Sequence, residues 1–452
     1  RRAKLKQTIG SGLLLFLGND ESGMNYADNT YHFRQDSTFL YFFGLPYAGL
    51  SAIIDIDNNR EIIFGDELTI DAIVWMGTQP TLKEKSEAAG ITEVRPFKEI
   101  ETYLKNAQQK GQPIHYLPTY RAEHQIKLFQ WLGVVPGAEK PSVPFIMGVV
   151  NQRNYKSEEE IAEIEKACIV TADMHLAAMR TVRPGIRESE VAAAVAEVAY
   201  ANNYELSFPI IATINGQTLH NHDHSNLIKS GDMLLLDAGA ETEMGYAGDM
   251  SSTIPADAKF TTRQREIYDI QVAAHEAAVA ALRPGIPFVD VYELSCKVIM
   301  EGLKELGFVK GDPMEAVRAG AHAMFMPCGL GHMMGLDVHD MEDLGQCYVG
   351  YDDEVQPSTQ FGLASLRMGR RLQKGFVITD EPGCYFIPAL IDKWKAEKLH
   401  TDFLNFEAIE KYKDFGGIRL EDDILITDNG SRFLGEKHIP ITFEEVEAIM
   451  NE

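Results

Sequence analysis

Five side chains of the kinds that bind metal ions occur in strand-rich stretches of the second half of the sequence. They are Asp237, Asp249, His332, Glu381 and Glu421. Each one alone has an ordinary structural explanation, because hairpin aspartates, single histidines and turn glutamates are common without a metal. Two carboxylates held close together repel, however, and one stays protonated unless a cation lies between them. The order and combination of the five favour a metal site.

The first two carboxylates fall on a predicted β-hairpin. The segment Met233–Gly239 is typical of a buried strand, and Tyr246–Ile254 is typical of the strand that returns after a short turn. We expect this hairpin to bring Asp237 and Asp249 together. Strand alternation places Ser251 on the same face as Asp249, so we expect its hydroxyl to orient that carboxylate.

The other three residues are also held by recognisable local patterns. Glycines around His332 allow the backbone to approach a ligand closely. Glu381 directly precedes Pro-Gly, which fixes it at a strand end or turn. The run Ile418–Ile426 is typical of a strand, on which alternation places Arg419 beside Glu421.

A duplicated pattern of helices precedes these strands. A capping box at Ser157 predicts a helix that ends before Arg183–Ile186, which reads Arg-Pro-Gly-Ile. A second capping box at Thr261 predicts a helix that ends before the same four residues at Arg283–Ile286, one hundred positions later. Matching caps and order favour an internal duplication, whose two sheets would meet at a site between them.

The first 155 residues are predicted to form a smaller α/β domain. Runs at Leu13–Leu17, Ser51–Ile56 and Glu61–Phe64 are typical of strands, with an Asn-Asn turn between the last two. An amphipathic helix is predicted at Phe97–Asn106, after Pro96. We find no catalytic cluster in this part of the sequence.

Composition excludes several classes of partner. The chain has 452 residues, with 42 Lys and Arg against 67 Asp and Glu, a net charge of -25. Such a charge argues against nucleic-acid phosphates and against anionic membrane surfaces. No apolar run approaches the ~20 residues of a membrane span. Five widely spaced cysteines without a Cys-x-x-Cys pair indicate reduced thiols. We therefore expect a cytoplasmic protein with no nucleic-acid partner and no membrane partner.

The order Asp, Asp, His, Glu-Pro-Gly, Arg-x-Glu resembles the metallopeptidase family of aminopeptidase P and prolidase, whose catalytic domain has the pita-bread fold. The segments Tyr31–Gln35 and Phe39–Leu45 resemble the small domain of that family. The resemblance covers nearly the whole chain. It implies an α+β protein: an aminopeptidase P-like accessory domain at residues 1–155, and a pita-bread catalytic domain, a duplicated α/β unit, at residues 156–452.

The resemblance further implies a dinuclear metal centre. By similarity, Asp249 and Glu421 bridge both ions, Asp237 completes one site, and His332 and Glu381 complete the other. Four carboxylates and one imidazole are too many for one tetrahedral zinc ion but suit two oxygen-preferring ions. Mn²⁺ is the expected metal, with Co²⁺, Zn²⁺ or Fe²⁺ as alternatives. Such a pair lowers the pKa of a shared water, and Glu381 resembles the catalytic proton shuttle from that water to the leaving nitrogen.

Positions that contact substrate also match the family. His220 resembles the histidine that lines the pocket for the prolyl ring, and His339 resembles the histidine that contacts the scissile peptide. Arg419 and Tyr385 match family positions near the site. An exposed polar loop would also explain His220, because it begins the run His-Asn-His-Asp-His. For the two later histidines of that run, the structural explanation is preferred.

One substrate position departs from the family. Cys328 stands four residues before His332, where the family usually has another substrate-binding histidine. A thiol cannot replace an imidazole as a donor, and it is instead a candidate soft ligand or oxidation-sensitive group.

Two activities remain open at this point. A prolidase must recognise the free carboxylate of a dipeptide, and arginine is the natural clamp for that group. Arg367 resembles the prolidase arginine, and the insertion at 386–415 also resembles prolidases. Aminopeptidase P must leave that end open, and Cys328 breaks the prolidase pattern. The preferred interpretation is an Xaa-Pro aminopeptidase, with an Xaa-Pro dipeptidase as the alternative.

The resemblance also sets expectations about partners. Substrates would be peptides or dipeptides with proline in the second position, and the protein would form a homodimer or a higher homo-oligomer. A non-catalytic pita-bread binding protein is the remaining alternative. It is disfavoured because all five candidate ligands are present.

Overall fold

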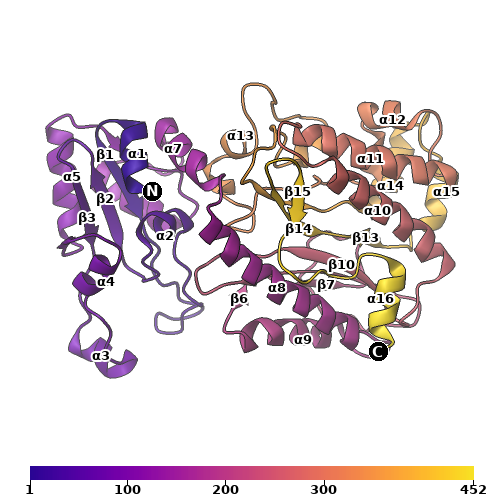
Figure 1. The fold of residues 1–452 in the computed structure, drawn as a ribbon, viewed down its shortest axis with the longest axis horizontal. Helices are drawn as coiled ribbons and strands as arrows, with labels where there is room; N and C mark the ends of the chain where they lie inside the picture. The colour runs from indigo at the N-terminus through magenta and orange to yellow at the C-terminus, as the bar shows by residue number, and fades with distance from the viewer. The chain divides into compact units, whose positions relative to one another are not determined.

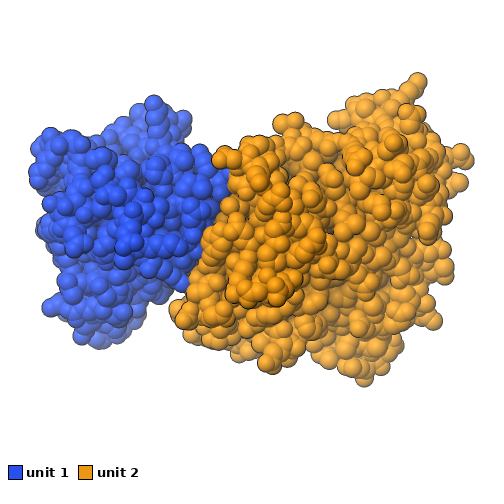
Figure 2. Space-filling model, turned by 45° about the horizontal axis from the view of Figure 1, so that its top comes forward, with its two compact units in different colours: residues 1–153, 341–348 blue, residues 154–340, 349–452 orange.

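The computed structural model describes residues 1–452, traced as a ribbon in Figure 1. The chain forms two compact units, coloured separately in Figure 2: unit 1 comprises residues 1–153 and 341–348, and unit 2 comprises residues 154–340 and 349–452. No helix has both the length and the apolar character needed to cross a membrane.

Unit 1 is built on one mixed five-stranded sheet in the order β4-β3-β2-β1-β5. Its strands are β1 (Leu13–Leu17), β2 (Ser51–Asp55), β3 (Arg60–Phe64), β4 (Glu93–Arg95) and β5 (Ile114–His115). Its helices are α1 (Arg2–Ile9), α2 (Ser37–Phe43), α3 (Ile70–Met76), α4 (Leu82–Ala88), α5 (Glu99–Gln109), α6 (Ala122–Leu132) and α7 (Val143–Arg153). The three predicted strands are confirmed, with shifts of one residue at two ends.

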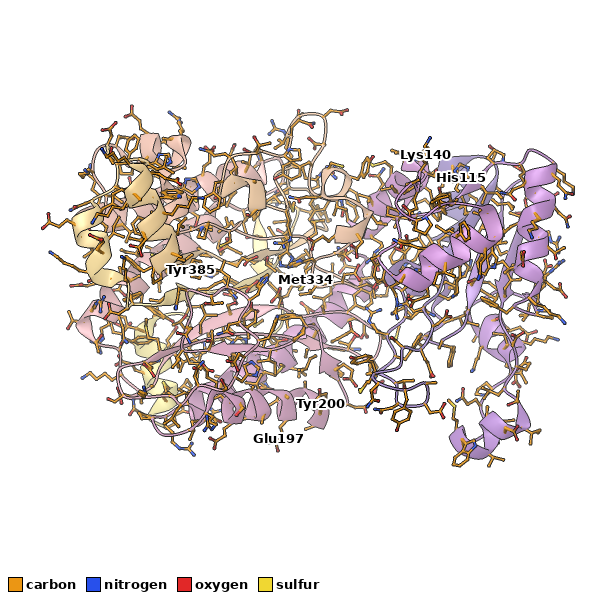
Figure 3. The ribbon with its side chains drawn as sticks, turned by 180° about the vertical axis from the view of Figure 1, so that it is seen from behind. His115, Lys140, Glu197, Tyr200, Met334 and Tyr385 are labelled. Carbon is orange, nitrogen blue, oxygen red and sulfur yellow. The ribbon has the colours of Figure 1, made fainter.

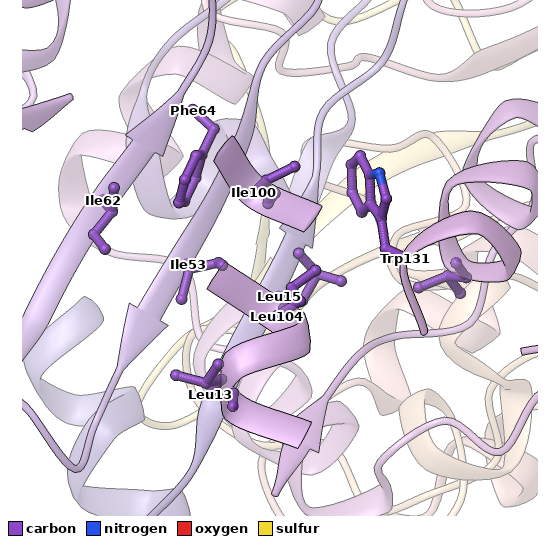
Figure 4. Packing of buried hydrophobic residues seen from close by; sticks show 10 residues of the cluster. Leu13, Leu15, Ile53, Ile62, Phe64, Ile100, Leu104 and Trp131 are labelled. Atoms are coloured by element: carbon purple, nitrogen blue, oxygen red, sulfur yellow. The ribbon is translucent and has the colours of Figure 1, made fainter. Parts of the chain in front are cut away.

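The core of unit 1 lies between the sheet and two helices (Figure 4). Phe64 of β3 and Leu15 of β1 pack in one buried cluster with Leu104 of α5 and Trp131 of α6. The predicted amphipathic helix is present, but α5 begins at Glu99 rather than directly after Pro96.

Unit 2 contains the two predicted capping boxes. Ser157 accepts a hydrogen bond from the backbone N–H of Glu160 at the start of α8 (Glu158–Thr181), and Thr261 does the same with Gln264 at the start of α10 (Thr262–Ala281). Each long helix packs against a second one, α8 against α9 (Glu188–Ala201) and α10 against α11 (Phe288–Glu305). In Figure 1 the two pairs lie on opposite sides of the central strands.

Strands follow each helix pair. The first half has β6 (Glu205–Leu206), β7 (Ile211–Thr213), β8 (Met233–Ala238), β9 (Ala240–Glu241) and β10 (Met250–Pro255). The second half has β11 (Val377–Asp380), β12 (Gly383–Tyr385), β13 (Gly417–Arg419), β14 (Asp422–Ile426) and β15 (Ser431–Phe433). The main sheets have the orders β10-β8-β7 and β11-β14-β15. The remaining helices of unit 2 are α12 (Pro313–Ala319), α14 (Pro388–Glu397), α15 (Phe406–Ile409) and α16 (Phe443–Met450), and the short α13 (Gln346–Val349) falls at the boundary of the two ranges.

The prediction of one continuous strand over Ile418–Ile426 is wrong. The segment forms β13, which pairs with β12, and then β14, which pairs with β11 and β15. The break falls at Leu420 and Glu421, because the N–H of Leu420 donates to Pro382 O and the N–H of Glu421 donates to Ser251 O instead of to a ladder partner. The break therefore occurs at a candidate metal ligand.

Candidate metal centre and active site

The first two candidate ligands are brought together by the predicted hairpin. Strands β8 and β10 are antiparallel, and Ser251 lies opposite Asp237 in the register. Asp249 directly precedes β10, and its backbone N–H donates to Asp423 Oδ2 at 2.9 Å. Both carboxyl groups are buried, with 8% exposure for Asp237 and 5% for Asp249.

The next two candidate ligands lie where a loop meets β11. Glu381 follows the last residue of β11, as its position before Pro-Gly predicts. The N–H of His332 donates to the Thr379 hydroxyl at 3.1 Å. A side chain at Gly331 would meet Thr379 O at 2.1 Å, so this close contact requires the glycine. Glycine thus allows the histidine loop to lie directly against the strand that presents Glu381.

Glu421 joins the two halves of unit 2. Its N–H donates to Ser251 O at 3.1 Å, and the Ser251 hydroxyl donates to Glu421 Oε2 at 2.6 Å. The expectation that Ser251 orients Asp249 is therefore wrong. The reason is that Glu421 of the second half pairs with Ser251 of β10, which places the Glu421 carboxylate within hydrogen-bond distance of this hydroxyl.

Three candidate ligands form a compact buried group. Asp249, His332 and Glu421 each offer one ligand atom, and these atoms lie within 4.8 Å of one another. The Nε2 atom of His332 is 3.4 Å from Asp249 Oδ2 and 3.7 Å from Glu381 Oε1. Glu381 therefore borders the group through the histidine.

Asp237 has a different environment, because its carboxylate is paired with Arg419. The guanidinium contacts Asp237 Oδ2, and it also donates to the Ser251 hydroxyl at 3.0 Å and to the Tyr385 hydroxyl at 3.1 Å. The second carboxylate oxygen, Oδ1, is buried without a hydrogen-bond partner. A buried carboxylate oxygen without a partner, on a residue that lines the same pocket as the other candidate ligands, is the setting expected of a metal ligand.

The electrostatics of the cluster fit divalent cations. Burial, and then the charge of Asp237, raises the pKa of Asp249 well above its usual range. Burial and the neighbouring carboxylates do the same to the pKa of Glu421, and burial raises the pKa of Glu381 to about 7. So many carboxylates cannot all ionise in a buried space without positive charge, and two divalent ions would supply it. The donor set therefore fits the implied metal group.

The cluster opens into a pocket of about 500 Å³. The pocket is lined by Phe208, Pro209, Ile211, Leu219, His220, His222, Asp237, Asp249, Pro327, Cys328, Gly329, Gly331, His332, Val338, His339, Ser365, Arg367, Glu381, Arg419 and Glu421. This set contains all five candidate ligands and every predicted substrate residue except Tyr385. A pocket of this size accommodates a small peptide.

The substrate residues predicted from the sequence occupy distinct places. The His339 ring lies 4.2 Å from the His332 ring, centroid to centroid. Tyr385, labelled in Figure 3, is fully buried, and its hydroxyl accepts a hydrogen bond from Arg419. His224 lies within hydrogen-bond distance of Ile210 O, at 3.0 Å, as its structural explanation requires, whereas His222 lines the pocket together with His220.

Sequence reasoning missed a buried charged group behind the second half of the site. His275 of α10 lies 2.8 Å from Asp380 Oδ2 and 3.1 Å from Asp422 Oδ2. These aspartates adjoin Glu381 and Glu421. One signal was available, because His275 and His175 each stand eight positions before an Arg-Pro-Gly turn.

A buried group of carboxylates and one imidazole that lines a pocket of this size suits metal-dependent hydrolysis. The profile of metallopeptidase family M24 matches residues 162–428, and that of the aminopeptidase P N-terminal domain matches residues 1–115. The chain belongs to metallopeptidase family M24, is an enzyme of that class with the pita-bread fold, and uses a divalent metal cofactor.

Individual relatives are similar over almost the whole chain. The Xaa-Pro aminopeptidase of Escherichia coli (strain K12) is 31% identical over 98% of this chain and 94% of its own length. The human Xaa-Pro dipeptidase is 29% identical over 99% of this chain and 91% of its own length. The structure of aminopeptidase PepP from Pseudomonas aeruginosa superposes with a TM-score of 0.81 at 25% identity, covering 100% of this chain and 97% of the other.

Proposed function

We propose that the protein is an Xaa-Pro aminopeptidase that hydrolyses the peptide bond before proline in the second position of a peptide. One observation carries this proposal: a single pocket combines the buried acid–histidine cluster with an apolar wall of Phe208, Pro209, Ile211 and Leu219. Such a wall suits the pyrrolidine ring of proline, whose methylene groups are apolar. The similarity to the aminopeptidase of E. coli supports the same substrate class.

In this proposal two ions, with Mn²⁺ as the native metal, would be held by Asp237, Asp249, His332, Glu381 and Glu421. Buried carboxylates favour such oxygen-preferring ions. When bound, paired divalent ions lower the pKa of water and polarise a carbonyl group. Asp237 would use its unpartnered Oδ1, because Arg419 already occupies Oδ2.

The residues around the cluster would bind the peptide and move its proton. Glu381 borders both His332 and the pocket, so it is placed to accept a proton from the attacking water and return it to the leaving nitrogen. His339, beside His332, would donate a hydrogen bond to the scissile peptide, and His220 would lie along the proline ring. Cys328 borders this space as a neutral thiol, because burial raises its pKa to about 12.

An Xaa-Pro dipeptidase is the second candidate, and Arg367 favours it. The Arg367 side chain lines the same pocket, where a guanidinium would bind the free carboxylate of a dipeptide in a bidentate manner. The human dipeptidase is also among the similar proteins. The two candidates share the cluster and differ in what the far end of the substrate meets.

Substrate length decides between the candidates. The assay compares Gly-Pro and Ala-Pro with a longer Xaa-Pro-Pro peptide, in Mn²⁺ and after chelation. Cleavage of the longer peptide is expected, and cleavage of dipeptides alone would contradict the aminopeptidase proposal. Arg367→Ala should lower kcat/KM for dipeptides far more than for the longer peptide if Arg367 clamps a carboxylate. Arg371→Ala is the matched control, because Arg371 is exposed and pairs with Glu354 outside the pocket.

Metal identity is tested separately from substrate choice. The metal-free protein is reconstituted with Mn²⁺, Co²⁺, Zn²⁺ or Fe²⁺, and both activity and bound metal per chain are measured. We expect two ions per chain and the highest activity with Mn²⁺. Activity that is indifferent to chelation, with no bound metal, would instead support a non-catalytic or metal-free relative of the fold.

We further propose the assembly, compartment and domain limits. Helix α3 supports a homodimer or higher homo-oligomer, because Ile70, Val74, Trp75 and Met76 are all well exposed on one short helix. All five cysteines are free thiols, which supports a cytoplasmic location. The accessory domain is assigned to residues 1–155 and the catalytic domain to 156–452. Light scattering of Trp75→Ser against the unchanged protein tests the assembly.

A further inference from the structure

Two buried histidines occupy equivalent places in the duplicated halves of unit 2. His175 on α8 stands eight positions before Arg183, and His275 on α10 stands eight positions before Arg283. They are almost fully buried, with 0% and 2% exposure. Neither residue lines the pocket, so neither contacts substrate.

Each histidine contacts two strands of its own half that contain or directly adjoin candidate ligands. For His175, Nδ1 lies 2.8 Å from the Ser252 hydroxyl on β10, and Nε2 lies 3.2 Å from Ala238 O on β8. For His275, Nδ1 lies 2.8 Å from Asp380 on β11, and Nε2 lies 3.1 Å from Asp422 on β14. A histidine at the same helix position thus contacts two strands in both halves, but only in the second half are its partners carboxylates.

We propose that His275 is a positioning residue, which bridges Asp380 and Asp422 and thereby holds Glu381 and Glu421 in the relative position that binds metal. The inference rests on the proposed metal centre. Asp380 and Asp422 are direct partners across the β11–β14 ladder, where like charges repel. An imidazole between them joins the strands, and each aspartate is chain neighbour to a ligand. Any separation of the strands would move both ligands.

The charge state agrees with this geometry. Burial disfavours a charged imidazole, but contact with Asp380 and Asp422 outweighs it and raises the pKa of His275 to about 10. Burial lowers the pKa of His175 to about 4, in keeping with its uncharged partners. The second half is therefore held by a buried ion triad, and the first half by contacts between neutral groups.

The test is Co²⁺ binding to the full-length, metal-free protein, followed by calorimetry and by the visible absorption spectrum of the bound ion. Outer residues that hold metal ligands typically contribute 10–100-fold in affinity. We expect His275→Gln to weaken Co²⁺ binding by about this factor and to change the spectrum. The matched control is His322→Gln, since His322 is equally buried in unit 2 and contacts Tyr292 and Val317 O rather than a strand that carries a ligand.

Each outcome is decisive. Wild-type Co²⁺ affinity and spectrum in His275→Gln would overturn the inference, as would an equal loss in His322→Gln, which would indicate a general effect of stability. If His275→Gln does not fold, the double variant His275→Gln/Asp380→Asn removes one of the two carboxylate charges that the single variant leaves unpaired. It is expected to fold and still bind Co²⁺ weakly, whereas wild-type affinity would overturn the positioning role. An unchanged protein that binds no Co²⁺ would overturn the proposed metal centre itself.

Discussion

The two halves of unit 2 share one scaffold and differ in their electrostatics. In the first half, β8 and β10 are held by His175 through a hydroxyl and a backbone carbonyl, and the Asp237 carboxylate is paired with Arg419. In the second half, β11 and β14 are held from behind by His275 between two carboxylates. The first half therefore carries its compensating cation at the pocket, and the second half carries it behind the strands.

The two halves therefore share the helix position of the supporting histidine but differ in the charge of its partners. The cation that compensates Asp237 belongs to β13, a strand of the second half, so the first half is not electrostatically complete alone. Buried acids need a partner or a proton. The halves meet that requirement with cations in different places.

The largest expected effect removes one candidate bridging ligand from each half. Asp249→Ala and Glu421→Ala should each lower kcat/KM on the order of 10³-fold, because either change leaves the cluster without a shared carboxylate. Activity and bound metal per chain are measured together. Equal losses are expected, and full activity in either variant would exclude that half from the metal centre.

The next effect concerns the cation shared between halves. Arg419→Met leaves Asp237 buried without a partner, and breaking such a pair costs about 3–5 kcal/mol. Urea unfolding of the metal-free protein measures this cost. Added Mn²⁺ should restore part of the stability, because a bound cation then faces Asp237. Arg263→Met is the control, since its exposed pair with Asp414 contributes about 1 kcal/mol or less.

The third prediction separates the halves by pH. Despite burial, its two aspartates raise the pKa of His275 from 6.5 to about 10, so its contribution to stability is complete below pH 6.5 and is lost as the pH rises towards 10. Burial lowers the pKa of His175 from 6.5 to about 4, so stability is lost as the pH falls from 6.5 towards 4. The free energy of unfolding in urea is measured against pH for each His→Gln variant. Its decrease at alkaline pH should be smaller in His275→Gln only, and its decrease at acid pH should be smaller in His175→Gln only.

The smallest effect lies behind the first half. Ser252→Ala removes one hydrogen-bond partner of His175 and should cost about 1 kcal/mol of unfolding free energy, with metal binding unchanged. Thermal unfolding and Co²⁺ titration measure the two quantities. A loss of metal affinity in Ser252→Ala would show that metal binding depends on the contacts of His175 as much as on those of His275.

Local patterns predicted those parts of the fold that depend on neighbouring residues. Both capping boxes, the helix ends at the Arg-Pro-Gly turns and the hairpin of Asp237 and Asp249 depend on residues close in the chain, and the structure contains all of them. The continuous strand over Ile418–Ile426 failed because alternation does not reveal which strand is the partner. The break at Glu421 follows from Ser251, 170 residues away.

The candidate site was predictable as a set of residue types but not as a network. The order of the five ligand-type residues was enough to select them from the sequence, and all five line the pocket. The pairing of Arg419 with Asp237 could not be read from the sequence, because these residues are 182 positions apart. His275 could have been found from its spacing to the repeated turn, but its two aspartate partners become evident only when β11 and β14 pair.

The contact between Ser251 and Glu421 has a consequence for how the protein is made in the cell. The ligand-bearing strands of the first half leave the ribosome long before residue 421, and until then Asp237 lacks Arg419 and Ser251 lacks its bridge. In a nascent chain the acidic residues of the first half would therefore lack their partners from the second half through much of synthesis. The complete candidate site therefore cannot form before the segment that contains Arg419 and Glu421 has been synthesised.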